Sequence, residues 1–309
     1  MALRIFESIE SAFCTCPPKY VINPYVVCEH GCVYCYGKSF WKRSLGRLSL
    51  SMDQYPYPKV ELVEKLRKEV RRKRKLPVLL SSIVDPYTPS ERKFELTRRI
   101  VEILSRNDFP ILIETKSNLV LRDVDLLDKG KTAICVSIST LDEEKAKRIE
   151  PNAPSPKLRM KTLEELSEEG FSTVLFLDPI IPYFTDNHEG LEELVKSASE
   201  AGVRQITFST LRVKKSIFKD LSRALPELKG KLKSLYFKNP ELRSGYYYAP
   251  LEKRVEIAKF LFSKSKEYEL KLFGCRMGLP QYCTAKSGDG QDFLRKKLKS
   301  LNLFLKSNY

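Results

Sequence analysis

The sequence predicts an α/β fold: a partial (β/α)6 barrel of the TIM type, followed by a helical C-terminal extension. Short β-rich runs alternate with amphipathic helical runs about six times over residues 20–225. Several β-rich runs are almost continuously apolar, as expected for parallel strands that are buried on both faces. Polar residues follow most of these runs, and the carboxyl ends of the strands are where such a barrel carries its functional site.

Six strands are expected in this barrel, and amphipathic helices lie between them. The strands cover Tyr20–Val27, Leu76–Ser82, Pro110–Lys116, Thr132–Ser139, Ser172–Leu177 and Gln205–Ser209. Apolar stripes at helical spacing include Val63, Leu66 and Val70, then Leu96, Ile100, Ile103 and Leu104, then Leu191, Leu194, Val195 and Ala198. The polar residues at the strand ends are Ser81, Ser82, Asp85, Lys116, Ser117, Ser137, Ser139 and Asp178.

The chain changes character after the barrel. Residues 235–250 are typical of a loop, a helix is expected over about 251–268, and a short strand ends at Cys275. A terminal helix carries Leu294, Leu298, Leu301 and Leu305 on one face. We therefore divide the chain into an N-terminal segment with a cysteine pair (1–19), the barrel (20–225) and an extension packed on that barrel (226–309).

Charge and hydropathy limit the functional classes. The chain has 55 Lys and Arg against 39 Asp and Glu, a formal charge of +16, which favours polyanionic partners and nucleic acid above all. A charged surface adapted to high temperature or solubility would give the same balance. No apolar run approaches the roughly 20 residues of a membrane span, and the first residues lack the pattern of a signal peptide. We expect a cytoplasmic protein that does not associate with membranes.

Three cysteines lie close together directly after the first strand. Cys28, Cys32 and Cys35 have the spacing Cys-x3-Cys-x2-Cys. Thiolates are the preferred ligands of iron–sulfur clusters, and Gly31 allows the chain to wrap closely around one. Three thiolates leave one iron of a four-iron cluster open for substrate or cofactor chemistry. The competing interpretation is a zinc site that His30 or a distant cysteine completes.

This segment resembles the signature of the radical S-adenosylmethionine (SAM) superfamily, in which an aromatic residue, here Tyr34, usually precedes the third cysteine. Further motifs are similar to the spore photoproduct lyase-like branch, in order over about residues 20–215: Asn23-Pro-Tyr, Asp85-Pro-Tyr-Thr-Pro-Ser-Glu-Arg, Leu96-Thr-Arg, Thr115-Lys-Ser, Leu121-Arg-Asp-Val-Asp, Ser137-Ile-Ser, Glu150-Pro and Pro179-Ile-Ile-Pro. The resemblance implies a partial or full (β/α) barrel. It also implies a [4Fe–4S] cluster on the three cysteines, which cleaves SAM to a 5′-deoxyadenosyl radical that abstracts a substrate hydrogen.

The resemblance also assigns residues to SAM. Tyr34 is expected near the adenine, and Ser81 or Ser82, Lys116, and Ser137 or Ser139 fall where that branch contacts SAM. Lys116 suits the SAM carboxylate as a point charge, and the serines suit the ribose or the amino group. An electron donor such as ferredoxin or flavodoxin is a further expected partner.

Nucleic acid is the leading substrate class, because the branch repairs DNA and the chain is strongly basic. The authentic photoproduct lyase returns a hydrogen atom from a cysteine near the end of the second strand, whereas Leu76–Ser82 contains none. This departure leaves open whether the chain carries out lyase-like repair or another modification. Radical modification of a protein or small metabolite is the alternative enzyme class. A zinc-stabilised nucleic-acid-binding module without catalysis is the alternative outside enzymes.

The remaining cysteines have several interpretations. Cys14, Cys16, Cys275 and Cys283 form a set of four thiols that can close a second iron–sulfur cluster or a zinc site. Disulfides and unrelated buried thiols are the alternatives. Cys135 lies between two apolar residues on the fourth strand, which favours a buried structural thiol.

Two further segments bear on a nucleic-acid partner. Residues 65–75 contain eight Lys or Arg in eleven positions, which predicts either a phosphate-contacting patch or a solvated helix surface. Tyr246, Tyr247 and Tyr248 follow Arg243. Tyrosines in this setting either stack on an unpaired base or pack within the protein.

Overall fold

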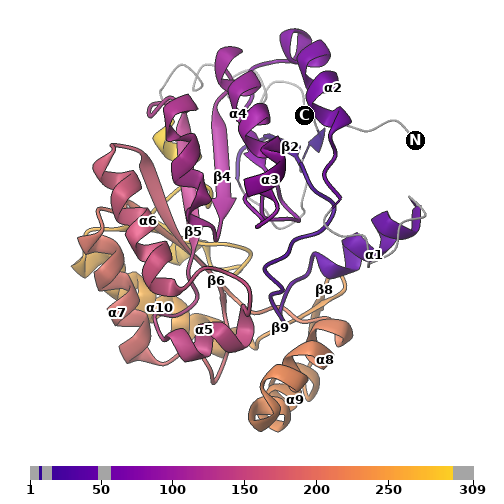
Figure 1. Cartoon of the computed structure of the whole chain (residues 1–309). Coiled ribbons are helices and arrows are strands. Elements are labelled where there is room, and N and C mark those ends of the chain that lie inside the picture. Colours follow the sequence, from indigo (N-terminus) through magenta and orange to yellow (C-terminus); the bar gives the residue numbers. More distant parts are fainter. Residues whose placement is uncertain (1–6, 9–15, 48–56, 295–309) are drawn as a thin grey trace, which may run out of the picture.

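The computed structural model describes residues 7–8, 16–47 and 57–294, and its centre is one curved sheet (Figure 1). Eight strands are hydrogen-bonded in the order β1-β2-β3-β4-β5-β6-β7-β10. Only β1 pairs antiparallel with its neighbour, and the other seven strands are parallel. The strands are β1 (Glu7–Ser8), β2 (Tyr20–Ile22), β3 (Val78–Leu80), β4 (Ile111–Thr115), β5 (Thr132–Ser137), β6 (Ser172–Ile180), β7 (Gln205–Thr210) and β10 (Lys271–Gly274).

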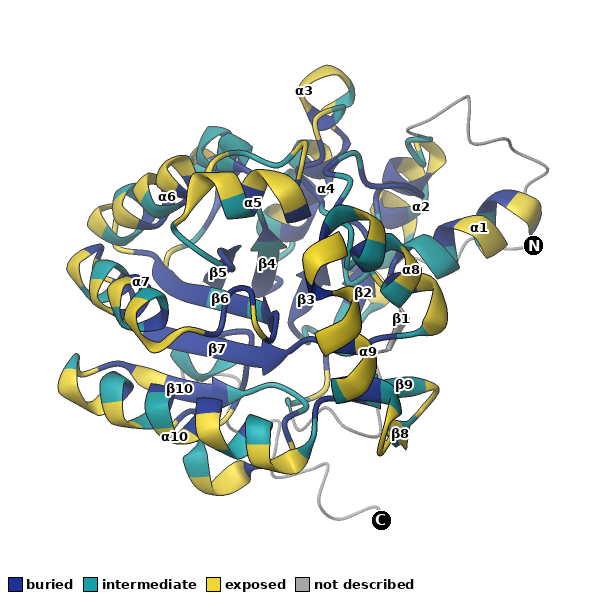
Figure 2. Ribbon diagram, turned by 90° about the horizontal axis from the view of Figure 1, so that it is seen from below, coloured by how far each residue is buried: buried dark blue, intermediate teal, exposed yellow. Residues whose placement is uncertain are grey.

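Helices cover the outside of the sheet, as a parallel sheet buried on both faces requires. In Figure 2 the central strands of the large sheet, such as β6 and β7, are mostly buried, and the helices expose their outer sides to solvent. The apolar stripes explain this packing, since Leu96, Ile100 and Leu104 of one helix are completely buried. The helices are α1 (Lys38–Arg47), α2 (Glu61–Glu69), α3 (Glu91–Phe94), α4 (Leu96–Arg106), α5 (Glu143–Ile149), α6 (Pro156–Glu168), α7 (His188–Glu200), α8 (Lys215–Ala224), α9 (Lys229–Phe237) and α10 (Leu251–Glu267).

The six expected strands are confirmed, although some are shorter than expected. β2 stops at Ile22 rather than at Val27, because Pro24 cannot donate a hydrogen bond to the ladder. The strand expected to end at Cys275 is β10, and it pairs in parallel with β7, with Leu272 opposite Ile206. The C-terminal part of the chain therefore adds a seventh parallel strand to the sheet. The partial α/β barrel is confirmed in this extended form.

The prediction of a loop over residues 235–250 is wrong. This stretch contains the end of α9 and a hairpin of β8 (Glu241–Arg243) and β9 (Tyr246–Tyr248). Ser244 and Gly245 form the turn with φ of +47° and +76°, the left-handed conformation that such a tight hairpin needs.

The amino-terminal end of the barrel is closed by a small apolar cluster. Leu294 packs there with Val21, Leu79, Leu112 and Ala133. The rest of the expected terminal helix, with Leu298, Leu301 and Leu305, lies outside the described residues. None of the helices in the described ranges combines the length and the apolar character needed to cross a membrane.

Candidate functional site

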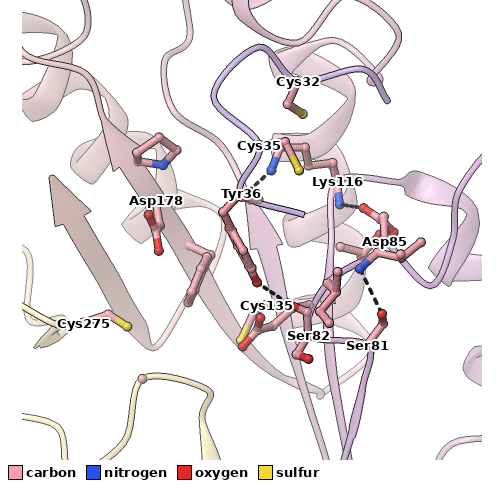
Figure 3. A pocket seen from close by; sticks show the side chains of 18 of the residues that line it. Cys32, Cys35, Tyr36, Ser81, Ser82, Asp85, Lys116, Cys135, Asp178 and Cys275 are labelled. Carbon is pink, nitrogen blue, oxygen red and sulfur yellow. Dashed lines mark hydrogen bonds between the residues drawn. The ribbon is translucent and has the colours of Figure 1, made fainter. Parts of the chain in front are cut away.

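A cavity of about 280 Å³, here called the central cavity, lies inside the sheet and reaches the carboxyl ends of the strands (Figure 3). Six of the polar residues expected at the strand ends line it: Ser81, Ser82, Asp85, Lys116, Ser137 and Asp178. Ser139 is not part of the lining; its hydroxyl is buried and has no hydrogen-bond partner among the described residues. Ser137 is therefore the member of the Ser137/Ser139 pair that can contact a ligand in the cavity.

The segment from Cys28 to Cys35, here called the cysteine loop, brings its three thiols to this cavity. Cys28, Cys32 and Cys35 all line it. Gly31 turns the loop with φ of +71°, and a Cβ atom there would lie 3.2 Å from Nδ2 of Asn152. Glycine is needed at this position both for the backbone conformation and for the close approach.

The chemical state of the three thiols fits a site that a metal cluster fills. Burial raises the pKa of Cys28 and of Cys35, and it raises the pKa of Cys32 to about 12. A thiol in such surroundings stays protonated unless it coordinates a metal, which displaces the proton. The three thiols thus line one cavity in surroundings that disfavour the free thiolate that nucleophilic catalysis requires.

The short segment from Ile149 to Asn152 holds the cysteine loop in place. The Val33 amide donates to the Ile149 carbonyl over 2.9 Å, and the Asn152 amide donates to the His30 carbonyl over 3.2 Å. Nδ2 of Asn152 also donates to the Glu29 carbonyl over 3.0 Å, and the Tyr34 hydroxyl donates to the Glu150 carboxylate. Four hydrogen bonds thus fix the loop to the end of α5 and the turn that follows it.

Glu150 is the centre of a buried group of charges. Nη1 of Arg159 lies 2.5 Å from one carboxylate oxygen of Glu150, and Nζ of Lys116 lies 3.8 Å from the other. Burial raises the pKa of Glu150, but the two cations outweigh this effect, so the pKa of the carboxyl is lowered. Burial likewise opposes the charge of Lys116, but Glu150 raises its pKa. Lys116 therefore presents a permanent positive charge at the cavity, where its Nζ donates to Oγ of Ser137 over 3.0 Å.

A second buried contact joins the cysteine loop to the strand ends. Nε2 of His30 lies 3.1 Å from Oδ2 of Asp85, and the two side chains are almost fully buried. Asp85 also accepts hydrogen bonds from Oγ1 of Thr115 and from the Lys116 amide, each over 2.7 Å. Burial raises the pKa of Asp85, but His30 and these hydrogen bonds lower it to about 2. Asp85 is therefore a fixed anion that ties β3, β4 and the cysteine loop together.

Three thiols are the donor type that an iron–sulfur cluster takes. Across residues 16–47 and 57–294, no three His, Cys, Asp or Glu side chains are placed so that they could hold one ion. A four-iron cluster does not need such convergence, because each thiolate binds a different iron. The zinc interpretation of the cysteine loop therefore has no support in the described part of the chain.

The residues expected to contact SAM surround the same space. The Tyr34 ring lines the cavity, and Nζ of Lys116 lies 5.9 Å from its centroid. Ser81 has φ of +63°, and its Oγ donates to Oδ1 of Asn23 over 2.8 Å. The carbonyl of Ser82 accepts a hydrogen bond from the Tyr36 hydroxyl, as Figure 3 shows.

The other cysteines are divided between the cavity and its surroundings. Cys16 and Cys275 line the central cavity, whereas Cys283 is absent from the lining and its Sγ accepts from the Gly274 amide over 3.3 Å. Cys14 lies outside the described residues. Cys135 is buried, but strand alternation turns its side chain into the cavity rather than into the helical layer (Figure 3).

The three consecutive tyrosines have different environments. Tyr248 is buried and Tyr247 packs edge-on against Phe237, with ring centroids 4.7 Å apart. Tyr246 alone among them lines the cavity, and Nζ of Lys214 lies 4.3 Å from its ring centroid. All three tyrosines thus pack within the protein, and Tyr246 also presents part of its ring to the cavity.

Several residues of this site cannot be found by sequence reasoning. The sequence suggests His30 only as a zinc ligand, and Arg159, Arg212 and Arg276 stand in no motif that points to the site. Glu150 belongs to a Glu-Pro motif, but its role as the partner of Lys116, Arg159 and Tyr34 depends on contacts between distant segments.

Comparison with known proteins assigns the family. A model of the radical SAM superfamily matches residues 22–198, which is more than half of the chain. An uncharacterised protein of Mycobacterium tuberculosis is 28% identical over 240 residues, which cover 74% of this chain and 71% of that protein. An uncharacterised protein of Methanocaldococcus jannaschii is 37% identical over 175 residues, which cover 54% of this chain and 62% of that protein.

Solved structures show the same fold. A spore photoproduct lyase mutant with dinucleoside spore photoproduct superposes with a TM-score of 0.62 at 17% identity, covering 82% of this chain and 75% of that one. SuiB of Streptococcus suis, bound to S-adenosylmethionine, gives a TM-score of 0.53 at 15% identity and covers 84% of this chain and 50% of that one. The chain belongs to the radical SAM superfamily, with a barrel fold similar to that of spore photoproduct lyase.

Proposed function

We propose that this protein is a radical SAM enzyme that abstracts a hydrogen atom from a nucleic-acid substrate. Cys28, Cys32 and Cys35 would hold a [4Fe–4S] cluster and leave one iron open for SAM. The observation that carries this proposal is that the buried thiols of Cys28 and Cys32, the half-buried thiol of Cys35 and the Lys116 ammonium all line one cavity. The bound cluster and SAM supply the one-electron cleavage of SAM that generates the hydrogen-abstracting radical.

The residues of the chain bind and position these groups. Lys116 offers a point charge for the SAM carboxylate, and Ser137 lies beside it as a hydroxyl partner. Tyr34 supplies an aromatic face for the adenine, and Ser81 or Ser82 supplies polar contacts.

Two features support nucleic acid as the substrate class. The formal charge of +16 favours binding to phosphates. The spore photoproduct lyase with the similar fold was solved with a dinucleoside photoproduct. The segment at the end of β3 reads Leu80-Ser81-Ser82 and has no cysteine, so we propose repair or modification of nucleic acid without specifying thymine-dimer cleavage. Radical modification of a protein or small metabolite is the competing proposal.

The reaction also needs an electron from outside the chain, and we propose a small donor such as ferredoxin or flavodoxin. A second cluster or a zinc site at Cys14, Cys16, Cys275 and Cys283 is a separate proposal. Its support is that Cys16 and Cys275 line the central cavity.

Metal analysis of the anaerobically purified protein tests these proposals together. We expect iron and acid-labile sulfide in a four-to-four ratio per chain, and an EPR signal of the reduced protein that shifts when SAM is added. About eight irons per chain would support a second cluster. Zinc alone, with no effect of SAM on any spectrum, would contradict the enzyme proposal and favour a zinc-stabilised binding module.

A further inference from the structure

An insertion between β7 and α10 carries a large part of the positive charge of the protein. Residues 211–249, here called the excursion, contain α8, α9 and the β8–β9 hairpin. They include ten Lys or Arg but only three Asp or Glu, so they contribute an excess of seven positive charges to the total of +16. In Figure 1 α8 and α9 project from the barrel on the side where α1 lies.

The three acidic residues of the excursion are already paired with other cations. Asp220 pairs with Lys38 and Arg223, Glu227 with Arg148, and Glu241 with two arginines. Eight of the ten basic residues have no acidic side chain within salt-bridge distance among the described residues. Their charges are therefore available to an external anion rather than neutralised within the fold.

The excursion borders the mouth of the central cavity. Its apolar side packs against Val33 and Tyr34 of the cysteine loop. Arg212 and Tyr246 line the cavity directly, and Lys214 lies over the Tyr246 ring. The base of the excursion therefore forms part of the wall of the cavity where the chemistry is proposed.

Exposed tyrosines are interleaved with these cations. Tyr183 is 45% exposed, and Nζ of Lys231 lies 5.9 Å from its ring centroid. Tyr36, at the cavity, is 40% exposed. Cations beside aromatic faces suit a single-stranded nucleic acid, because the cations bind phosphates and the rings stack on bases. An acidic peptide would use the charges but not the aromatic faces.

The most basic run of the sequence lies elsewhere. Residues 65–75 end just before β3, whereas the cavity residues Ser81 and Asp85 follow that strand. These positions are therefore at opposite ends of the strand. Arg67 is paired with Glu64, and Lys75 packs over the Phe109 ring. This run therefore lies at the other end of the barrel from the cavity mouth, and charge changes there serve as the control in the experiment below.

We infer that the excursion binds the phosphate backbone of a single-stranded or locally unpaired nucleic acid and presents one base to the central cavity. This inference rests on the proposed function for the identity of the substrate. The unpaired state follows from the position of the cavity inside the barrel, because a base within a duplex must leave its stack to enter such a pocket.

Two matched variants test this inference. Lys215→Glu with Lys219→Glu changes two exposed positions one turn apart on α8, and Lys68→Glu with Arg72→Glu makes the same charge change in the 65–75 run. Binding of a labelled single-stranded DNA oligonucleotide is measured by fluorescence anisotropy over a salt series. We expect the α8 variant to bind about tenfold more weakly, with a salt slope that falls by about 0.7 for each phosphate that the variant no longer neutralises. The control variant should bind within about twofold of wild type.

Three results would overturn the inference: equal weakening in both variants, tighter binding to a fully paired duplex than to the single strand, or competition by polyglutamate that matches competition by unlabelled oligonucleotide. Reductive SAM cleavage without nucleic acid is measured in parallel and should be unchanged in both variants. Wild-type protein that cleaves SAM but does not bind the oligonucleotide refutes the inference while radical SAM chemistry stands. Oligonucleotide binding through α8 without SAM cleavage refutes the proposed function alone.

Discussion

Nη1 of Arg159 on α6 lies 2.5 Å from Oε2 of Glu150, and each side chain is only 1% exposed. The same carboxylate accepts a hydrogen bond from the hydroxyl of Tyr34 in the cysteine loop. The guanidinium also donates to the Ser137 carbonyl over 2.9 Å. One buried ion pair thus connects α6, the end of β5 and the loop that carries the proposed cluster ligands.

Replacing Glu150 with Gln should strongly destabilise the protein. The change leaves Arg159 as a buried charge without its counterion, which costs about 3–5 kcal/mol of unfolding free energy. Urea unfolding of the cluster-free protein measures this destabilisation. Glu165→Gln, in the exposed pair with Lys161, is the control and should cost less than about 0.5 kcal/mol. A destabilisation below about 1 kcal/mol in the Glu150 variant would show that the ion pair does not hold the loop.

Acid should weaken the fold through Asp85. Its pKa is lowered to about 2 in the folded protein, against about 3.9 in an unfolded chain. Its contribution to stability is therefore fully present above about pH 4 and disappears as the pH falls towards 2, with a size of about 2 kcal/mol. The difference in unfolding free energy between wild type and Asp85→Asn should shrink by this amount over that range. A constant difference would contradict the lowered pKa of Asp85.

Two cysteines of the same cavity should behave differently. Cys32→Ala should abolish cluster binding and SAM cleavage while the fold, followed by circular dichroism, is retained. Cys135→Ala removes another buried thiol that lines the cavity, and it should keep four irons per chain. SAM cleavage by the Cys32 variant at the wild-type rate would refute the ligand assignment.

Lys116→Met should weaken SAM binding without loss of iron. A hydrogen bond to a charged group contributes about 1.5–3 kcal/mol, so the dissociation constant of SAM should rise about tenfold to a hundredfold. Lys129→Met is the control, because Lys129 is exposed and pairs with Glu169. Spectroscopic titration of the reconstituted protein with SAM gives both constants. An unchanged constant in the Lys116 variant would place the SAM carboxylate elsewhere.

Much of the barrel could be predicted because its elements are coded locally. Continuous apolar runs identified β4 and β5, and apolar stripes at helical spacing identified α4 and α7. The hairpin at residues 241–248 escaped prediction, since its strands are only three residues long and all their residues except Tyr248 are exposed or half-exposed. The pairing of β10 with β7 joins residues more than sixty positions apart, and a local sequence pattern cannot predict which strand pairs with which over such a separation.

The order of residues along the chain specifies the reactive groups of the site, namely the spacing of Cys28, Cys32 and Cys35 and the polar residues at the strand ends. Only folding selects the side chains that set the electrostatics of this site and hold the cysteine loop in place. His30 with Asp85, and Glu150 with Lys116 and Arg159, meet only after folding, because burial and opposite charge select partners by distance in space. The placement of Arg212 in the cavity lining and of Lys214 over the Tyr246 ring has the same origin.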